Sequence, residues 1–198
     1  IYIMKTIHKI MKLINNKNKT KKIYRKKHTK IPGKVSYTGG KKYSNAVAIL
    51  AHNKYNITGR IDLHETKKGL NILYDIKGLK NGEHGFHIHN YGDLSDGCKS
   101  ACSHFNPYNK NHGGLHSERR HLGDLGNITS KNNICKGELF VKDINICRHL
   151  KTSVLGRMII IHKNKDDLGL GNNKESLKTG NAGERVACGV IGLANDQS

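Results

Sequence analysis

The sequence predicts an all-β fold, an antiparallel sandwich or barrel, on three observations. Beyond residue 45 the apolar residues come in short runs without a sustained helical period. These runs are rich in Ile and Val, which strands favour. Turn-forming Gly, Asn and Asp separate them, as at 78–82 and 132–133. The predicted strands are 46–50, 57–63, 70–76, 86–89, 134–141, 144–146, 158–162 and 186–194.

Two long stretches between these runs carry little strand pattern, 90–126 and 163–185. Loops of this length in a compact domain are usually functional, or are held by something other than an apolar core. The first stretch follows a pair of histidines and contains several more. We therefore expect metal-binding side chains to hold these loops.

The chain has 198 residues and a formal net charge of +20, and no apolar run reaches 18 residues. An integral membrane protein is therefore not expected. A charge this high first suggests a partner that is a nucleic acid or an anionic surface. However, residues 1–44 contain 13 Lys, one Arg and no acidic residue. They carry +14, which leaves +6 for residues 45–198.

We therefore predict a basic N-terminal extension, 1–44, and one domain, 45–198. The extension is expected to be disordered beyond Leu13, because a segment with this much charge and so few apolar residues cannot offset the entropy lost on ordering. A short amphipathic helix over 3–14 is an alternative for its first part. The extension would then bind an anionic surface or a nucleic acid, or direct the chain to an organelle.

Three histidines are placed to bind a metal from strands. His87 and His89 are two residues apart, so on a strand both imidazoles point to the same face. His162 ends another apolar run. A set of imidazoles with few carboxylates suits copper or zinc.

A second set of donors lies in the first long loop. Three imidazoles and one carboxylate make a full tetrahedral zinc set, which is typical of a structural zinc without an open position. The residues of this set are His104, His112, His121 and Asp124.

The domain closely resembles the copper–zinc superoxide dismutases over about three quarters of the chain. The resemblance rests on several motifs in the family's order: HGFHIH at 84–89, CKSACSHFNP at 98–107, HGG at 112–114, RHLGDLGN at 120–127, GRMIIIH at 156–162 and GNAGERVACGVIG at 180–192. It implies an eight-stranded Greek-key β-barrel or sandwich with two long functional loops.

The resemblance also implies which residues bind each metal. The implied copper ligands are His87, His89, His104 and His162. The implied zinc ligands are His104, His112, His121 and Asp124. His104 would bridge the two metals, and Asp166 would link a copper ligand to a zinc ligand from behind. His84 matches a structural histidine that binds no metal.

The implied activity is that of an oxidoreductase which converts two superoxide anions into O2 and H2O2. Copper would be reduced and reoxidised in turn, while zinc stays structural. Arg185 matches the arginine that docks the anion, and Lys178 and Thr179 match residues that guide anions and limit the channel. Lys174 departs from the family, where many relatives carry an acidic residue.

The five cysteines cannot all pair within the chain. By resemblance, Cys98 and Cys188 form a disulfide. Cys102, Cys135 and Cys147 are then expected to be thiols, and Cys102 is close enough in sequence to exchange with Cys98.

The resemblance further implies a homodimer through Gly92, Gly156 and 191–194, and metal loading by a copper chaperone. The expected location is cytoplasmic, with an organelle or a particle as the alternative if the extension targets the chain. Two other functions remain open on the sequence alone, a catalytically silent metal-binding relative and a binding module tethered by the extension.

Overall fold

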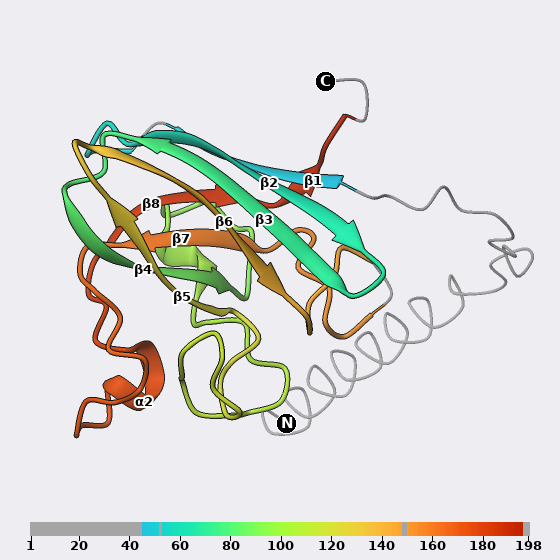
Figure 1. Ribbon diagram of the computed structural model, residues 1–198, viewed down its shortest axis with the longest axis vertical. Coiled ribbons are helices and arrows are strands. Elements are labelled where there is room, and N and C mark those ends of the chain that lie inside the picture. Colours follow the sequence, from blue (N-terminus) through green and yellow to red (C-terminus); the bar gives the residue numbers. More distant parts are fainter. Residues whose placement is uncertain (1–44, 52, 148–149, 196–198) are drawn as a thin grey trace, which may run out of the picture. The chain divides into compact units, whose positions relative to one another are not determined.

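The computed structural model describes residues 45–51, 53–147 and 150–195, and these form two antiparallel β-sheets (Figure 1). One sheet has the order β6-β3-β2-β1-β9, made of Ile134–Val141, Gly69–Lys77, Thr58–Thr66, Asn45–Leu50 and Gly192–Leu193. The other has the order β5-β4-β7-β8, made of Asp124–Ser130, Gly82–His89, Met158–His162 and Arg185–Val190. Helix in the described residues is limited to η1 (Lys99–Ala101) and α2 (Ser176–Thr179). The predicted all-β fold is confirmed.

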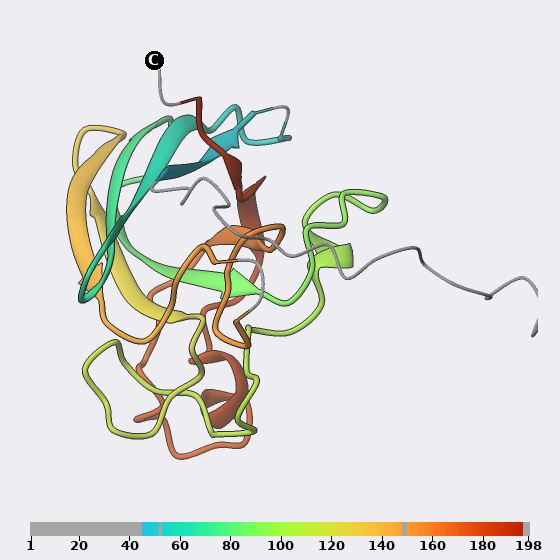
Figure 2. The same ribbon diagram turned by 90° about the vertical axis from the view of Figure 1, so that its right-hand side faces the viewer.

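The core lies between the two sheets, whose strands curve around it (Figure 2). On β3, Leu70, Ile72 and Ile76 are fully buried, whereas Leu73 points outward and is 39% exposed. This alternation follows from the two-residue period of a strand. On β7, by contrast, every residue is buried. Because no residue of β7 faces solvent, both faces of this strand must be covered.

The strand predictions were wrong in three places. The run 144–146 is not a strand, because Ile144 and Ile146 fill the core from a loop that forms only one isolated bridge. The predicted loop 90–126 overlaps β5, which starts at Asp124 and pairs with β4. The last run divides at Ile191 into β8 and β9, which belong to different sheets.

Two long loops cover the outer face of the four-stranded sheet. One joins β4 to β5, the other joins β7 to β8 and contains α2, and both figures place them on the same side of the sheet (Figures 1 and 2). The amide of His112 in the first loop donates a hydrogen bond to the carbonyl of Leu177 in the second, at 2.9 Å. The loops therefore form a cover over the outward-facing side chains of β4 and β7.

The N-terminal extension, with its predicted helix over 3–14, lies outside the described residues and stays a prediction. Among the residues that the structure describes, none of the helices is both long and apolar enough to cross a membrane.

Candidate metal centre

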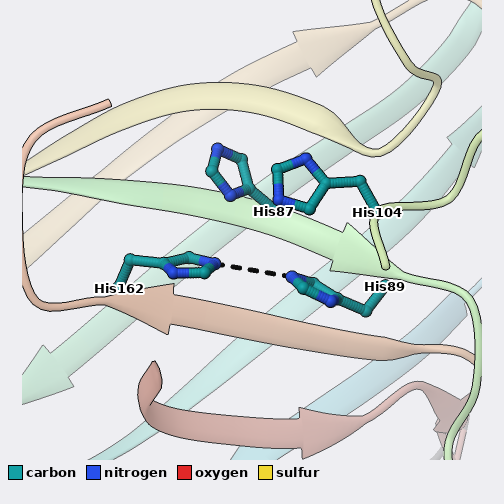
Figure 3. Close-up of side chains that lie close together, drawn as sticks. All are labelled: His87, His89, His104 and His162. Atoms are coloured by element: carbon teal, nitrogen blue, oxygen red, sulfur yellow. Dashed lines mark hydrogen bonds between the residues drawn. The ribbon is translucent and has the colours of Figure 1, made fainter. Parts of the chain in front are cut away.

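Four imidazoles meet under the loop cover (Figure 3). His87 and His89 project from β4, His162 ends the neighbouring strand β7, and His104 comes from the first loop. The Nε2 atoms of His89 and His162 are 3.4 Å apart, and the ligand atoms of all four residues lie within 4.8 Å of one another. The structure thus brings together the four residues that the resemblance implies as copper ligands. All four rings are buried.

A second donor group shares His104. The Oδ1 atom of Asp124 lies 2.8 Å from Nδ1 of His104, 3.0 Å from Nδ1 of His112 and 3.1 Å from Nδ1 of His121. The amides of His121 and Gly113 donate to the other oxygen, Oδ2, and fix the carboxylate. Three ring nitrogens thus converge on one carboxylate oxygen, which is a complete set for a tetrahedral ion.

The protons on the outer ring nitrogens decide which nitrogens are free to bind a metal. Nδ1 of His89 donates to the carbonyl of Cys102 at 2.7 Å, and Nδ1 of His162 donates to the carbonyl of Gly183 at 3.0 Å. A carbonyl only accepts, so each of these nitrogens carries the proton. The two Nε2 atoms that face each other therefore carry no proton, and each has a lone pair free to bind a metal.

Asp166 fixes two further rings in the same way. Its Oδ2 accepts from Nε2 of His87 and its Oδ1 accepts from Nε2 of His112, both at 2.8 Å. Asp166 is fully buried and is itself held by Asn127, whose carboxamide bonds its amide and its carbonyl. The carboxylate links one histidine of each group, as a residue that orients metal ligands does.

The described residues include three buried side-chain nitrogens without a hydrogen bond: Nδ1 of His87, Nε2 of His104 and Nδ1 of His112. Nδ1 of His112 lies near Asp124 but is not aligned for a hydrogen bond. Leaving a buried polar atom unpaired costs about 1–3 kcal/mol. All three atoms point into the two donor groups, so the residues fit two metal ions, with His104 facing one ion through each nitrogen.

Burial also sets the charge of the imidazoles. It lowers the pKa of His87, His89 and His104, and it lowers that of His162 to about 4. These rings are therefore neutral near pH 7 and available as ligands. Burial alone would lower the pKa of His112 as well, but the carboxylates of Asp124 and Asp166 outweigh it and raise the value to about 9.

A cavity of about 710 Å³ opens onto the first donor group. His89, His104 and His162 line it, together with Arg185, Lys178 and Thr179. His121 of the second group also lines the cavity, whereas His112 and Asp124 do not. The cavity therefore borders three residues of the first group, and of the second group only His121 and the shared His104.

Comparison with known proteins agrees with this arrangement. A model of the family described as copper/zinc superoxide dismutase (SODC) matches residues 57–191, which is more than half of the chain. The chain belongs to this family. The Cu-Zn superoxide dismutase of Paramecium bursaria Chlorella virus 1 is 48% identical over 153 residues, covering 77% of this chain and 80% of the relative.

Two further similarities extend the comparison. The Cu-Zn superoxide dismutase of Saccharomyces cerevisiae is 47% identical over 154 residues, covering 76% of this chain and 98% of the yeast protein. The crystal structure of the clock protein EA4 superposes with a TM-score of 0.74 and 40% identity, covering 80% of this chain and 99% of that one. Both proteins are matched over nearly their whole length.

In this dismutase domain the predicted disulfide between Cys98 and Cys188 is present. It ties the first loop to β8. The guanidinium of Arg185 donates to the carbonyls of Cys98, Lys99 and Cys102, at 2.6, 3.1 and 2.5 Å. The disulfide and the arginine thus hold the same short segment around η1, beside the cavity.

Sequence reasoning missed three groups that shape the dismutase site. Arg120 is buried and donates to the carbonyls of His121, Leu122 and Asp124, and it also pairs with Asp143. Glu175 and Leu177 line the cavity, and Glu175 accepts from the hydroxyl of Thr179 at 2.8 Å. Arg120 stands next to a predicted ligand in sequence, which was the one available signal. No spacing pattern marks the other two.

Zinc uptake by the metal-free protein is expected to release about one proton per ion near pH 7.5. His112 is protonated below its pKa of about 9, and zinc needs its Nδ1 as a lone pair. Asp124 adds no proton, because the three neighbouring imidazoles outweigh its burial and hold its pKa far below the usual value. An indicator dye in weakly buffered solution measures the release. At about pH 10 the proton release should disappear. A number of released protons that does not change with pH would contradict the assignment of a positive charge to His112.

Replacing Cys102 by Gly is expected to stabilise the domain by about 1 kcal/mol. Cys102 has φ 63° and ψ −143°, a conformation that residues with a side chain rarely adopt. Its carbonyl accepts from both Arg185 and His89, so the backbone is held in this shape. Urea unfolding of C102G measures the gain, with C147G as the control because Cys147 is an exposed thiol without positive φ. An equal or lower midpoint for C102G would contradict the strain.

Proposed function

We propose that the protein is a superoxide dismutase that converts two superoxide anions into O2 and H2O2. One observation carries the proposal. Two buried donor groups share His104, and the first lines, through His89, His104 and His162, a cavity that the cations Arg185 and Lys178 also border. Superoxide is a small anion, so a redox metal behind a cationic opening suits it. Superoxide dismutases are a known example of such electrostatic steering. The cations that border this cavity are what such steering requires.

The two groups differ in the metal that they suit. Four imidazoles with an open side suit copper, which favours nitrogen donors in a tetragonal arrangement. The copper ligands are then His87, His89, His104 and His162. Three imidazoles and a carboxylate, all of them buried, suit a structural zinc. The zinc ligands are then His104, His112, His121 and Asp124.

Copper, when bound, supplies the one-electron exchange with superoxide, and the chain's own residues supply the rest. Lys178 and Arg185 draw the anion into the cavity, and the guanidinium of Arg185 orients it. Three carbonyls around η1 keep that guanidinium in place. Arg185 thus serves as a docking group of fixed position.

His104 is the group placed to move a proton. Its Nδ1 faces Asp124 and the other zinc ligands, while its Nε2 faces the open group and lacks a hydrogen bond. Nε2 therefore takes up a proton and gives it to the reduced product in alternation. Asp166 holds His87 and His112, so the ring of His104 that carries the proton lies beside rings of fixed orientation.

Dismutation is expected to fall about 10-fold or more in Arg185→Ala, and to fall in the wild type as ionic strength rises. The cause is the loss of the docking cation and the screening of the remaining charge. Stopped-flow decay of superoxide measures both effects. Arg60→Ala is the control, because Arg60 is an exposed arginine paired with Asp62 on β2 and should leave the rate unchanged. Equal rates for R185A and wild type would refute the docking role.

The function itself is tested by superoxide decay with the protein loaded with copper and zinc, and again after treatment with a chelator. Rapid decay that the chelator abolishes is the expected result. A protein that retains both metals but leaves the decay at its uncatalysed rate would be a silent metal-binding relative instead.

The same family membership supports a homodimer. Gly92 and Gly156 lie against each other, since a Cβ on Gly92 would come within 2.4 Å of the carbonyl of Gly156. Gly156 is in turn bonded to the carbonyl of Ile191 at 2.8 Å. Exposed apolar side chains on neighbouring parts of the domain, Ile49, Leu94 and Leu193, offer a surface for a second copy. Light scattering on the purified chain tests this part of the proposal.

Loading by a copper chaperone and a cytoplasmic location are further parts of the proposal. Relatives include a yeast enzyme and an extracellular superoxide dismutase of Brugia pahangi, which is 44% identical over 156 residues and covers 77% of this chain and 78% of the relative. The relatives thus include proteins from more than one cellular location. The division into 1–44 and 45–198, and a tether from the extension to an anionic surface or nucleic acid, belong to the same proposal.

A further inference from the structure

Arg157 contacts two segments that each follow a copper ligand. It lies one residue before β7, and its Nη1 donates to the carbonyl of Asn90 at 2.7 Å. Its guanidinium carbon is 3.6 Å from the centre of the Phe105 ring. Asn90 directly follows His89 and Phe105 directly follows His104. Arg157 therefore contacts the neighbour of each ligand without touching the ligands themselves.

These two segments have little regular structure to hold them. β4 ends at His89, and His104 lies in a loop that meets β4 through a single isolated bridge, His89 to His104. Backbone bonds reinforce this bridge, from Asn90 to Ser103 at 3.0 Å and from Phe105 to Ile88 at 2.8 Å. The relative position of the two imidazoles is thus set by hydrogen bonds at the end of the sheet and by the side chains that contact these segments.

Arg157 approaches this contact from the residue just before β7, and hydrogen bonding fixes its own position. Its Nε donates to the carbonyl of Ser153 at 2.8 Å, and the side chain is half-buried. A guanidinium can stack on an aromatic ring and donate in its own plane at the same time, which an ammonium cannot do. Charge-assisted hydrogen bonds are also stronger than neutral ones. One side chain therefore ties both segments to the start of β7, the strand that carries His162.

We propose that Arg157 is a positioning residue of the copper site, which fixes His89 relative to His104 by holding Asn90 and Phe105. This role rests on the proposed function, because it takes both histidines as copper ligands. It predicts that loss of the guanidinium changes the geometry at copper, and not only the stability of the domain.

The test compares Arg157→Ala and Arg157→Lys with the wild type, using the full chain loaded with copper and zinc. Electron paramagnetic resonance of Cu(II) reports the ligand geometry, and a chelator assay reports the rate of copper release. In R157A the hyperfine splitting is expected to shift and copper release to be about 10-fold faster. R157K should lie between R157A and the wild type, because Lys can donate to Asn90 but cannot also stack on Phe105.

Ile146→Ala is the matched control. Ile146 is buried in the same connection between β6 and β7, so its truncation lowers the unfolding midpoint through the core. It should keep the wild-type copper spectrum. A spectrum and release rate in R157A equal to those of the wild type, with a lowered midpoint alone, would show a structural role only and overturn the proposal.

Two other outcomes are also decisive. If R157A does not fold, R157K decides the matter, since an unchanged spectrum and release rate in that variant overturn the role. If the wild type binds no copper, both the proposed function and the role of Arg157 fail. A wild type with a normal copper signal that neither variant alters leaves the proposed function standing and removes only the positioning role.

Discussion

Replacing His162 by Ala is expected to lower the dismutation rate by more than about 100-fold, since even residues that only orient metal ligands change affinity or activity by about 10–100-fold. His162 supplies one of the four imidazoles of the open group, and its Nε2 faces that of His89 at 3.4 Å. Without this ring copper loses a ligand on the side where the cavity opens. Copper content and superoxide decay of the variant measure the effect.

The control for this variant is His116→Ala. His116 belongs to the first loop, which also carries His104, and it is exposed and not part of either donor group. Its removal should leave copper content and rate at the wild-type values. Full activity in H162A, with copper retained, would overturn the assignment of the copper ligands.

Removal of the disulfide is expected to lower the free energy of unfolding by about 4 kcal/mol. Cys98 and Cys188 are 90 residues apart in sequence, so the bond closes a long loop and restricts the unfolded chain strongly. Replacing both cysteines by Ser avoids leaving a free partner for Cys102. Urea unfolding of the double variant in the metal-loaded state measures the loss.

The same double variant should also bind the substrate less well. The bond fixes the segment whose carbonyls hold Arg185, so a looser segment allows this guanidinium to move. Cys147→Ser is the control, since Cys147 is an exposed thiol outside this segment. In the unfolding experiment, a loss of less than about 1 kcal/mol in the free energy of unfolding of the double variant would mean that the metals and packing hold the loops, with little contribution from the disulfide.

Much of the fold could be predicted, because burial leaves a direct pattern in the sequence. The unbroken run Met158–His162 predicted a strand, and β7 is indeed buried along its whole length. β5 was missed because its sequence, DLGNITS, has the Gly and Asn of a turn, and only pairing with β4 makes it a strand. The run 144–146 misled in the opposite way, since its two isoleucines are buried by tertiary packing alone.

The site could be predicted as far as side-chain types and spacing carry information. The two-residue spacing of His87 and His89 predicted one shared face, and both rings do point into the donor group. Spacing does not reveal which carbonyls fix the rings, because every residue has a carbonyl. The acceptors at Cys102 and Gly183 therefore needed the folded structure, as did the contact of Arg157 with Phe105.

One buried centre, with His104 shared between two metals, is proposed to dismutate superoxide. Metal analysis of the purified full chain, combined with superoxide decay on the same sample, tests this most directly. We predict about one copper and one zinc per chain, with catalysis that rises in proportion to copper content. A chain that binds both metals in these amounts and does not accelerate superoxide decay would contradict the proposal.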